Sequence, residues 1–221
     1  MPKDKPEKVP TATISRLVTY LRILTQLEQQ GISKSSSEHL AEEAHVSAFQ
    51  VRKDLAYFGR FGTRGEGYKV FTLRRELGRI LGLTRSWGAA LVGAGRLGQA
   101  LAHYPNFNHE NFNFHLKACF DIDPAKIGQE IAGYRVAHPD SLPQVVREKG
   151  IDIGLLTVPQ EHAQDAADAL VRAGIKGILN FAPTVIEVPK DVHVEAVDFL
   201  AGLSRLSFYI QNPQYKEELT P

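Results

Sequence analysis

The sequence predicts an α/β protein with three parts: a small helical domain, a doubly wound parallel sheet and a final apolar helix. Three observations predict this fold. Beyond residue 84, near-continuous apolar runs alternate with segments of helical periodicity, as in parallel strands joined by helices. A glycine-rich turn follows the first of these strands. Before residue 84 the strand pattern is replaced by short segments that begin with helix-capping residues.

Charge also separates the chain into two parts. The chain up to Ile80 holds 14 lysines and arginines against 9 acidic residues, and the rest holds 12 against 16. This asymmetry suggests different partners for the two parts, with chance as the alternative explanation.

The first residues, M-P-K-D-K-P-E-K, are charged and lack the apolar core of a signal peptide, and no apolar run has the length of a membrane span. We expect a disordered arm over residues 1–10 and a cytoplasmic protein.

Two short capped helices follow a longer one in the basic part. Residues 12–29 are the first predicted helix, because apolar residues recur there every three or four positions. Ser35 and Glu38 form a capping box that opens a helix through residue 44. Ser47 and Gln50 form a second box, whose helix runs to about Phe58. Two helices separated by three or four residues are the signature of a helix-turn-helix motif.

The third predicted helix has one apolar stripe, so its opposite face carries polar side chains. Gln50, Lys53 and Tyr57 lie on that face, with Arg52 at its edge. Glutamine can read adenine, lysine and arginine can reach guanine or phosphate, and Ser47 at the helix start can bond phosphate. An ordinary solvated helix face is the alternative explanation.

Residues 59–70, G-R-F-G-T-R-G-E-G-Y-K-V, have the glycines and alternating side chains of a β-hairpin. Arg60 and Arg64 would lie at its tip, and Lys69 is a further DNA-binding candidate. A helix-turn-helix followed by a basic hairpin is a winged helix-turn-helix, whose recognition helix enters the major groove and whose wing contacts the minor groove or phosphate. The sequence therefore predicts a DNA-binding domain, with a protein-interaction module as the alternative.

The stretch W-G-A-A-L-V-G-A-G-R-L-G-Q-A-L-A-H has the pattern of a strand, a tight turn and a helix. Gly93, Gly95 and Gly98 fit the G-x-G-x-x-G motif of Rossmann-like domains: the first permits the turn, the second lets a pyrophosphate approach, and the third allows close helix packing. The start of the helix directs N–H groups and its positive end at the phosphates. The candidate phosphate-binding residues are Gly93, Ala94, Gly95, Arg96, Leu97 and Gly98. A purely structural turn is the alternative.

An acidic strand end, F-D-I-D, follows the glycine motif. Asp121 lies 28 residues after Gly93, more than the typical spacing of about 20, so residues 104–113 would form an additional loop. A carboxylate at this position bonds a ribose 2′-hydroxyl and repels a 2′-phosphate, which favours NAD over NADP. Asp121 is the first candidate and Asp123 the second, with plain surface aspartates as the alternative.

Further strands are predicted at residues 117–121, 151–158, 177–181 and 192–197, with a helix at residues 160–173. Ligands of such sheets bind beyond the carboxyl ends of the strands. Thr157, Pro159 and Asn180 lie at these ends and are candidates for the nicotinamide side of the pocket. Ordinary loop chemistry would also account for each of them.

A final helix with an apolar stripe begins after Asp198 and contains Phe199, Leu203, Leu206 and Ile210. It either folds back on its own sheet or docks into a second subunit. DNA readers of this type are usually two-fold dimers on palindromic sites, which favours the second arrangement.

Other chemistry has little support in the sequence. Cys119 lies in an apolar strand and is expected to be a buried hydrophobe rather than a nucleophile. There is no Cys/His cluster at metal-ligand spacing, and no stretch after Asp123 long enough to be a substrate domain. We therefore expect no catalytic residue and no metal. An NAD-dependent oxidoreductase with a basic helical appendage, a nucleotide-gated adaptor and a CoA-binding protein remain alternatives.

A nicotinamide pocket without a nearby carboxylate should favour neutral NADH over NAD⁺, because burying an unpaired charge is costly.

Several of these stretches resemble the Rex family of bacterial redox-sensing repressors. They include R-L-V-T-Y-L-R-I-L, S-S-S-E-H-L-A, Q-V-R-K-D-L-A-Y-F-G-R-F-G-T-R-G-E-G-Y, L-V-G-A-G-R-L-G-Q-A-L, A-G-I-K-G-I-L-N-F-A-P and V-D-F-L-A-G-L. His45 stands where the family commonly has glycine, and Ala56 where it has serine. The resemblance implies a homodimer that binds palindromic operator DNA when NAD⁺ is abundant and is released by NADH. It also implies an exchanged C-terminal helix, with Phe199 of one subunit near the nicotinamide of the other.

Within that mechanism, Arg16, Tyr104 and Asp198 are candidate members of a polar switch, although Arg16 could equally be a solvated helix residue. The expected organisation is a winged-helix DNA-binding domain over residues 11–83 and a Rossmann-like NAD(H)-binding domain over residues 84–197. Residues 198–221 would form the dimerisation helix.

Overall fold

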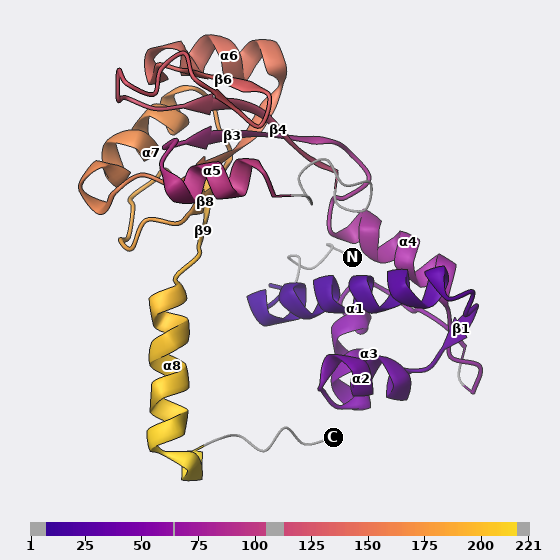
Figure 1. Cartoon of the computed structure of the whole chain (residues 1–221). Helices are drawn as coiled ribbons and strands as arrows, with labels where there is room; N and C mark the ends of the chain where they lie inside the picture. The colour runs from indigo at the N-terminus through magenta and orange to yellow at the C-terminus, as the bar shows by residue number, and fades with distance from the viewer. Residues whose placement is uncertain (1–7, 64, 105–112, 216–221) are drawn as a thin grey trace, which may run out of the picture. The chain divides into compact units, whose positions relative to one another are not determined.

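The computed structural model describes residues 8–63, 65–104 and 113–215. The chain divides between residues 84 and 85 into two compact units (Figure 1). Each unit has its own apolar core.

The N-terminal unit is built from four helices and one short two-stranded ladder. Its elements are α1 (Thr11–Gln29), β1 (Lys34–Ser35), α2 (Ser37–Ala44), α3 (Ala48–Ala56), β2 (Tyr68–Lys69) and α4 (Val70–Ile80). The core is formed by the apolar stripe of α1 packed against α2, α3 and α4, and includes the fully enclosed Leu17, Leu24 and Leu77. The helices predicted from periodicity and capping residues are therefore present.

The second unit contains a seven-stranded sheet with the order β5-β6-β4-β3-β7-β8-β9. The strands are β3 (Trp87–Val92), β4 (Phe114–Phe120), β5 (Glu130–Ile131), β6 (Tyr134–Ala137), β7 (Ile151–Leu156), β8 (Gly177–Asn180) and β9 (His193–Ala196). All neighbouring strands pair in parallel except β5 and β6, which form an antiparallel hairpin. The predicted doubly wound parallel sheet is confirmed.

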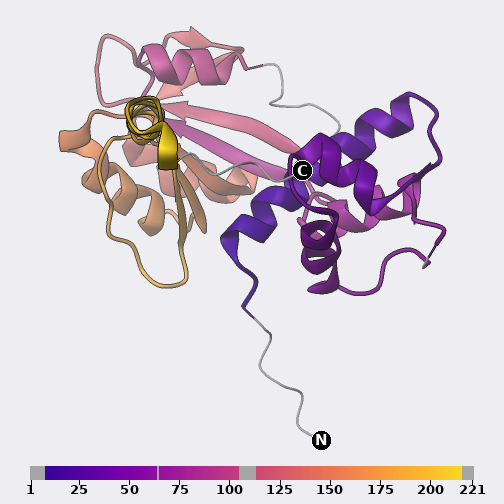
Figure 2. The ribbon, with the colours of Figure 1, turned by 90° about the horizontal axis from the view of Figure 1, so that it is seen from below.

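Helices cover both faces of this sheet (Figure 2). The short helix α5 (Arg96–Ala102) packs on one face through Ala102, and α6 (Leu142–Lys149) and α7 (Ala163–Arg172) pack on the other. Short 3₁₀ turns lie at Pro139–Ser141, Gln160–His162 and Pro213–Tyr215. The hairpin of β5 and β6 and the helix α6 were not predicted from the sequence.

The last helix, α8 (Phe199–Gln211), contains no buried residue. Asp198 is its N-cap, and its Oδ1 accepts a hydrogen bond from the N–H of Ala201 at 2.9 Å. Phe199, Leu203, Leu206 and Ile210 are 57–80% exposed. The predicted helix is present, whereas its exchange between subunits stays a prediction.

The first capping box was assigned one residue too early. Ser36, not Ser35, is the N-cap of α2, and its hydroxyl accepts a hydrogen bond from the N–H of His39 at 3.2 Å. Ser35 belongs to β1, where it pairs with Tyr68 of β2 and is 7% exposed. The ladder with β2 therefore fixes Ser35 in a strand, and only the next residue can start the helix. Ser47 is the N-cap of α3, as predicted.

This difference gives a direct test. Ser36→Ala should lower the free energy of unfolding of the N-terminal unit by about 1 kcal/mol, because an orphan N–H loses its acceptor. Ser35→Ala is the matched control and should cost less, since the Ser35 hydroxyl is buried without a hydrogen-bond partner in the described structure. Urea unfolding of the two variants compares them. A larger loss for Ser35→Ala would contradict the assignment.

The wing has less strand than predicted. Among the described residues of 59–70, antiparallel pairing is limited to one bridge between Thr63 and Gly67, and β2 pairs with β1 instead of with the preceding arm of the hairpin. The backbone packs closely here: a Cβ on Gly67 would lie 2.4 Å from the carbonyl oxygen of Ser35, and Gly67 has a φ of 73°. Arg60 precedes the bridge rather than lying at the tip of the loop, and Arg64 lies outside the described residues.

Candidate nucleotide pocket and nucleic-acid interface

A cavity of about 600 Å³ lies beyond the carboxyl ends of β3, β4 and β7. At β3 the sheet is extended in opposite directions, toward β4 on one side and toward β7 on the other. Open α/β sheets bind ligands at such a switch point. The nucleotide-site candidates that line the cavity are Gly93, Gly95, Arg96, Leu97, Asp121, Asp123, Thr157 and Pro159.

The three motif glycines have different surroundings. Gly93 has a φ of 103°, and a Cβ there would lie 2.6 Å from the carbonyl oxygen of Thr157. A Cβ on Gly98 would lie 2.0 Å from the carbonyl oxygen of Gly93. A Cβ on Gly95 would meet no atom of the described residues within 4 Å. Gly93 and Gly98 are thus required for the turn and its packing, whereas Gly95 leaves open space, as the approach of a pyrophosphate requires.

Two polar side chains hold the glycine turn in place. The hydroxyl of Thr157 donates to the carbonyl oxygen of Gly93 at 2.7 Å and contacts that of Val92 at 3.1 Å. On the other side, Oδ2 of Asp121 accepts a hydrogen bond from the N–H of Ala94 at 2.7 Å. The ends of β4 and β7 are thereby joined to the loop after β3, which fixes the shape of the cavity floor.

Asp121 is already occupied by groups of its own chain. It is 6% exposed, its Oδ1 accepts from the N–H of Asp123 at 2.9 Å, and its Oδ2 lies 3.0 Å from Nζ of Lys126. Burial alone raises the pKa of this carboxyl, but the hydrogen bonds from Asp123, Lys126 and Ala94 outweigh it, so its pKa lies below the ordinary value. Asp123 has a side chain that is 45% exposed and lies 3.7 Å from Lys126. Oδ1 of Asp123 also accepts a hydrogen bond from the N–H of Ala125 at 2.9 Å, so Asp123 is distinguished from Asp121 by its exposure and not by a lack of partners.

Four other nucleotide-site candidates do not line the cavity: Ala94, Gly98, Asn180 and Phe199. Asn180 is 2% exposed, and its amide bonds the carbonyl oxygen of Thr184 and the N–H of Ala182 at 2.8 and 2.9 Å. It therefore orders the loop after β8. Phe199 begins α8 and is 66% exposed. Tyr104, a switch candidate, is 52% exposed just after α5.

The cavity also contains lining residues that the sequence analysis did not identify, among them Ile122, Lys126, His162 and Asp165. Ile122 and Lys126 follow β4, and His162 and Asp165 lie at the start of α7. Their only sequence signal is their position shortly after a strand end. A third carboxylate, that of Asp165, thus lines the cavity in addition to those of Asp121 and Asp123.

Cys119 is fully buried in β4, and burial raises the pKa of its thiol to about 11. The thiolate that oxidants and alkylating agents attack is therefore scarce at neutral pH. We expect the folded protein to react with a thiol-specific disulfide reagent far more slowly than the same protein in denaturant, where the thiol is exposed. Equal rates in both conditions would contradict this expectation.

The candidate DNA-binding residues of α3 differ in how exposed and how engaged they are. Lys53 and Arg52 are exposed, and Tyr57 is half-buried at the end of the helix. Arg52 donates to Oγ of Ser37 at 2.8 Å and to Oε1 of Glu38 at 3.1 Å, so its guanidinium is partly engaged with α2. The ring of Phe49, 68% exposed in the first turn of α3, was not anticipated because it lies outside the apolar stripe.

Gln50 and Arg16 share a partner that the sequence analysis missed. Gln50 is half-buried rather than outward, and its Nε2 donates to Oδ1 of Asp54 at 2.8 Å. The guanidinium of Arg16 binds both oxygens of the same carboxylate, at 2.6 and 2.7 Å. Arg16 is therefore not a simple solvated residue of α1.

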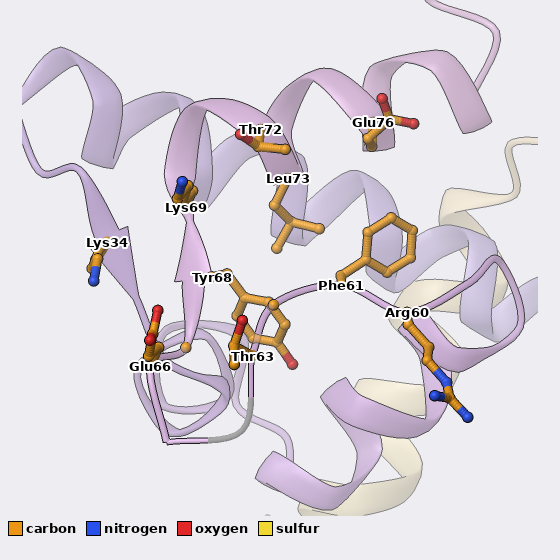
Figure 3. A pocket seen from close by; sticks show the side chains of 12 residues that line it. Lys34, Arg60, Phe61, Thr63, Glu66, Tyr68, Lys69, Thr72, Leu73 and Glu76 are labelled. Carbon is orange, nitrogen blue, oxygen red and sulfur yellow. The ribbon is translucent and has the colours of Figure 1, made fainter.

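A second cavity, of about 440 Å³, lies between the wing segment and α4 (Figure 3). Phe61, Tyr68 and Leu73 line it and belong to the core of the N-terminal unit. Lys34 and Lys69 sit opposite each other on β1 and β2 and are both exposed. The wing is thus attached to α4 by apolar contacts, while its lysines remain at the surface. Lys34 adds a cation that the sequence analysis did not include.

The residues that the structure describes contain no group of three or more His, Cys, Asp and Glu side chains that could hold a metal ion. Within the same residues, no helix combines the length and the apolar character needed to cross a membrane.

Family models match both units of the chain. The model described as "CoA binding domain" matches residues 84–184, and the one described as "Putative DNA-binding protein N-terminus" matches residues 8–56. A "Redox-sensing transcriptional repressor Rex" of Thermus thermophilus is 62% identical over 212 residues, which cover 96% of this chain and 99% of the relative. The protein of the same name from Deinococcus radiodurans is 50% identical, with 93% and 95% covered.

Solved structures agree with these relatives. A crystal structure of RSP with β-NAD⁺ and operator DNA superposes with a TM-score of 0.87 at 41% identity and covers 94% of each chain. RSP is described as a Rex-family repressor, and its complex with β-NADH matches with a TM-score of 0.82 at 38% identity, covering 97% of this chain and all of RSP. The chain therefore belongs to the Rex family of redox-sensing transcriptional repressors.

Proposed function

We propose that this protein is a cytoplasmic repressor that binds palindromic operator DNA as a homodimer when NAD⁺ is abundant and leaves it when NADH binds. One observation carries the proposal: a single chain combines a helix-turn-helix unit with a cavity at the switch point of a dinucleotide-type sheet. Relatives over nearly the whole length are repressors, which supports a regulator rather than an oxidoreductase.

The nucleotide site proposed here fits a dinucleotide diphosphate. Gly95 leaves room above the loop, and the exposed cation of Arg96 lies in the same lining. Asp123 would accept the ribose hydroxyl, because its side chain is 45% exposed whereas that of Asp121 is 7% exposed. When bound, NAD(H) would supply the redox signal, because its nicotinamide ring is positively charged in NAD⁺ and neutral in NADH. Apolar groups such as Pro159 and Phe199 would then disfavour the cationic ring of NAD⁺, provided that the ring lies away from the Asp165 carboxylate that also lines the cavity.

The proposed DNA-binding surface consists of the residues along and at both ends of α3 and of the wing. It comprises Ser47, Gln50, Arg52, Lys53, Tyr57, Arg60, Arg64 and Lys69. Exposed cations on α3 and β2 supply the phosphate contacts that dominate affinity, and Gln50 supplies a polar group that can distinguish bases. Residues 11–83 would form this DNA-binding domain and residues 84–197 the nucleotide domain.

Dimerisation is proposed to use residues 198–221. The apolar side chains of α8 are exposed along its length, a surface that soluble monomers rarely leave uncovered. The sheet offers a matching surface, since Ile153 and Leu179 on the face that carries α5 are only half-buried. Two copies exchanging α8 would cover both surfaces, and Phe199 would then reach the partner's nucleotide site.

Arg16, Tyr104 and Asp198 are proposed to form the polar switch between the two states. Arg16 and Asp198 carry opposite charges, and the Asp198 side chain is exposed. The NADH-bound dimer would hold its recognition helices at a spacing that no longer matches the operator. Linkage then requires DNA to weaken NADH binding by the same factor by which NADH weakens DNA binding.

The test is selection of the full-length protein against a pool of random duplexes, with excess NAD⁺ and then with NADH, at one moderate salt concentration. We expect a palindrome to be enriched with NAD⁺ and released by NADH, and light scattering to give the mass of a dimer. The absence of any enriched sequence in both conditions would reject the repressor function. Comparable calorimetric affinities for NAD⁺ and NADH would reject redox sensing while leaving DNA binding intact.

A further inference from the structure

Asp54 is the only fully enclosed charge among the described residues of the N-terminal unit, with 0% exposure. Its hydrogen-bond donors come from two helices. Thr13 Oγ1 and Tyr20 OH on α1 each lie 3.0 Å from it, and Arg16, also on α1, donates through Nε and Nη2. The remaining donor, Nε2 of Gln50 at 2.8 Å, lies on α3 one turn before Asp54. One carboxylate therefore connects the first helix to the candidate recognition helix.

This network fixes the orientation of the Gln50 amide. A carboxylate only accepts hydrogen bonds, so Gln50 must turn its Nε2 toward Asp54. Oε1 of Gln50 then points elsewhere, and one N–H of the amide remains for another partner. A glutamine with both ends of its amide unconstrained would instead sample several rotamers and lose that freedom on binding.

We propose that Asp54 is a positioning residue for base recognition, which holds the amide of Gln50 in one orientation and couples it to Arg16. The inference rests on the proposed function, because it assigns base reading to α3. With Nε2 held by Asp54, Gln50 presents Oε1 as an acceptor for the amino groups of adenine or cytosine in the major groove. A contact of this kind discriminates between bases by about 5- to 150-fold.

The same carboxylate connects Gln50 to the proposed switch. Arg16 supplies two of the five donor contacts on Asp54, and its Nη2 shares Oδ1 with Gln50 and Thr13. If Arg16 turned to another carboxylate, the charge balance at Asp54 would change, and with it the anchor of the Gln50 amide. A change in the position of Arg16 would thus affect the Gln50 side chain through Asp54.

The experiment compares full-length Asp54→Asn, Gln50→Ala and the double variant with the wild type, by duplex selection with NAD⁺ at fixed salt. Tyr20→Phe is the matched control, because it removes one donor to Asp54 and keeps both the Gln50 and the Arg16 side chains, although the Tyr20 hydroxyl also interacts with Arg16. Melting temperatures are recorded for all proteins. We expect Asp54→Asn and Gln50→Ala to lose preference at the same base pair in each half-site, by about 5-fold or more, and the double variant to lose no more than either.

Tyr20→Phe should melt at a lower temperature yet keep the wild-type preference at every position. If Asp54→Asn keeps that preference too, or loses it to the same extent as Tyr20→Phe, Asp54 has only a structural role and the inference is overturned. If the wild type enriches no sequence, the proposed function fails as well, which separates the two failures.

A measurement on the wild type covers the case in which Asp54→Asn does not fold. With ¹⁵N-glutamine labelling, the side-chain amide of Gln50, assigned through Gln50→Ala, should be rigid on the nanosecond timescale in the absence of DNA. An amide as mobile as that of an exposed glutamine would overturn the inference.

Discussion

Gly98→Ala is expected to destabilise the nucleotide-binding unit strongly, whereas Gly95→Ala, three residues earlier in the same turn, is expected to leave its stability unchanged. A Cβ on Gly98 would lie 2.0 Å from the carbonyl oxygen of Gly93, and a backbone atom cannot move aside cheaply. Overpacking of this kind costs about 3 kcal/mol or more. Gly95 has a φ of −76° and open space at its Cβ position, so alanine fits there.

Although Gly95→Ala should leave the stability of the unit unchanged, it should lower the affinity for the nucleotide. In Gly95→Ala the added methyl group enters the space proposed for the diphosphate, and we expect NADH affinity to fall by about 10- to 100-fold with the melting temperature unchanged. Thermal unfolding followed by Trp87 fluorescence reports on this unit, because Trp87 is the one tryptophan of the chain. Calorimetric titration with NADH gives the affinity. Wild-type NADH affinity in Gly95→Ala would place the diphosphate elsewhere.

Local sequence patterns predicted most of the fold. Periodicity located α1, α7 and α8, and a side-chain cap located the start of α3. The glycine motif predicted the turn after β3, because the positive φ of Gly93 and the close approach of Gly98 to the carbonyl oxygen of Gly93 are local requirements. Such signals are readable from one sequence, since the residues that interact are close together along the chain.

What was missed depends on contacts between distant segments. Ser35 lost its role as a cap because β1 pairs with β2, more than 30 residues later. Asp54 was not identified from the sequence, because its Thr13, Arg16 and Tyr20 partners lie on α1. Likewise Asp121 gave the signal of a ribose-binding acid, while its bond to the N–H of Ala94 depends on the packing of β4 against β3. Sequence alone located the acids but could not tell which carboxylate is open to a ligand.

The largest effect in the N-terminal unit is expected for Arg16→Ala. Asp54 would keep its hydrogen bonds from Thr13, Tyr20 and Gln50 but lose its counter-ion while remaining buried. Removing one partner of a buried ion pair costs about 3–5 kcal/mol. Arg16→Lys, which keeps the cation without the bidentate geometry, should lose less. Urea unfolding followed by circular dichroism measures the difference, and equal stabilities of wild type and Arg16→Ala would contradict it.

The same pair makes the unit sensitive to acid. Burial raises the pKa of Asp54, but hydrogen bonds from Arg16, Gln50, Tyr20 and Thr13 outweigh it, so its pKa is lower in the folded than in the unfolded protein. A carboxyl with a lowered pKa contributes stability above its unfolded pKa of about 3.9 and loses that contribution as the pH falls toward the folded value. Unfolding free energy should therefore decline below about pH 4 in the wild type and decline less steeply in Asp54→Asn. Asp121 has the same kind of shift in the other unit, so Trp87 fluorescence must be followed alongside circular dichroism to separate the two transitions.

This stability effect also decides how the proposed switch can be tested. Loss of NADH-controlled DNA release in Arg16→Ala would follow from a broken switch or from a loosened N-terminal unit, because Arg16 holds Asp54 and through it Gln50. Asp198→Ala avoids this ambiguity for the other half of the switch. It removes the N-cap of α8, at a cost of about 1 kcal/mol, and does not touch the Asp54 network. If Asp198→Ala abolishes release by NADH while NADH affinity and DNA affinity with NAD⁺ stay near wild type, the switch is supported. If release is unchanged, Asp198 has no part in it.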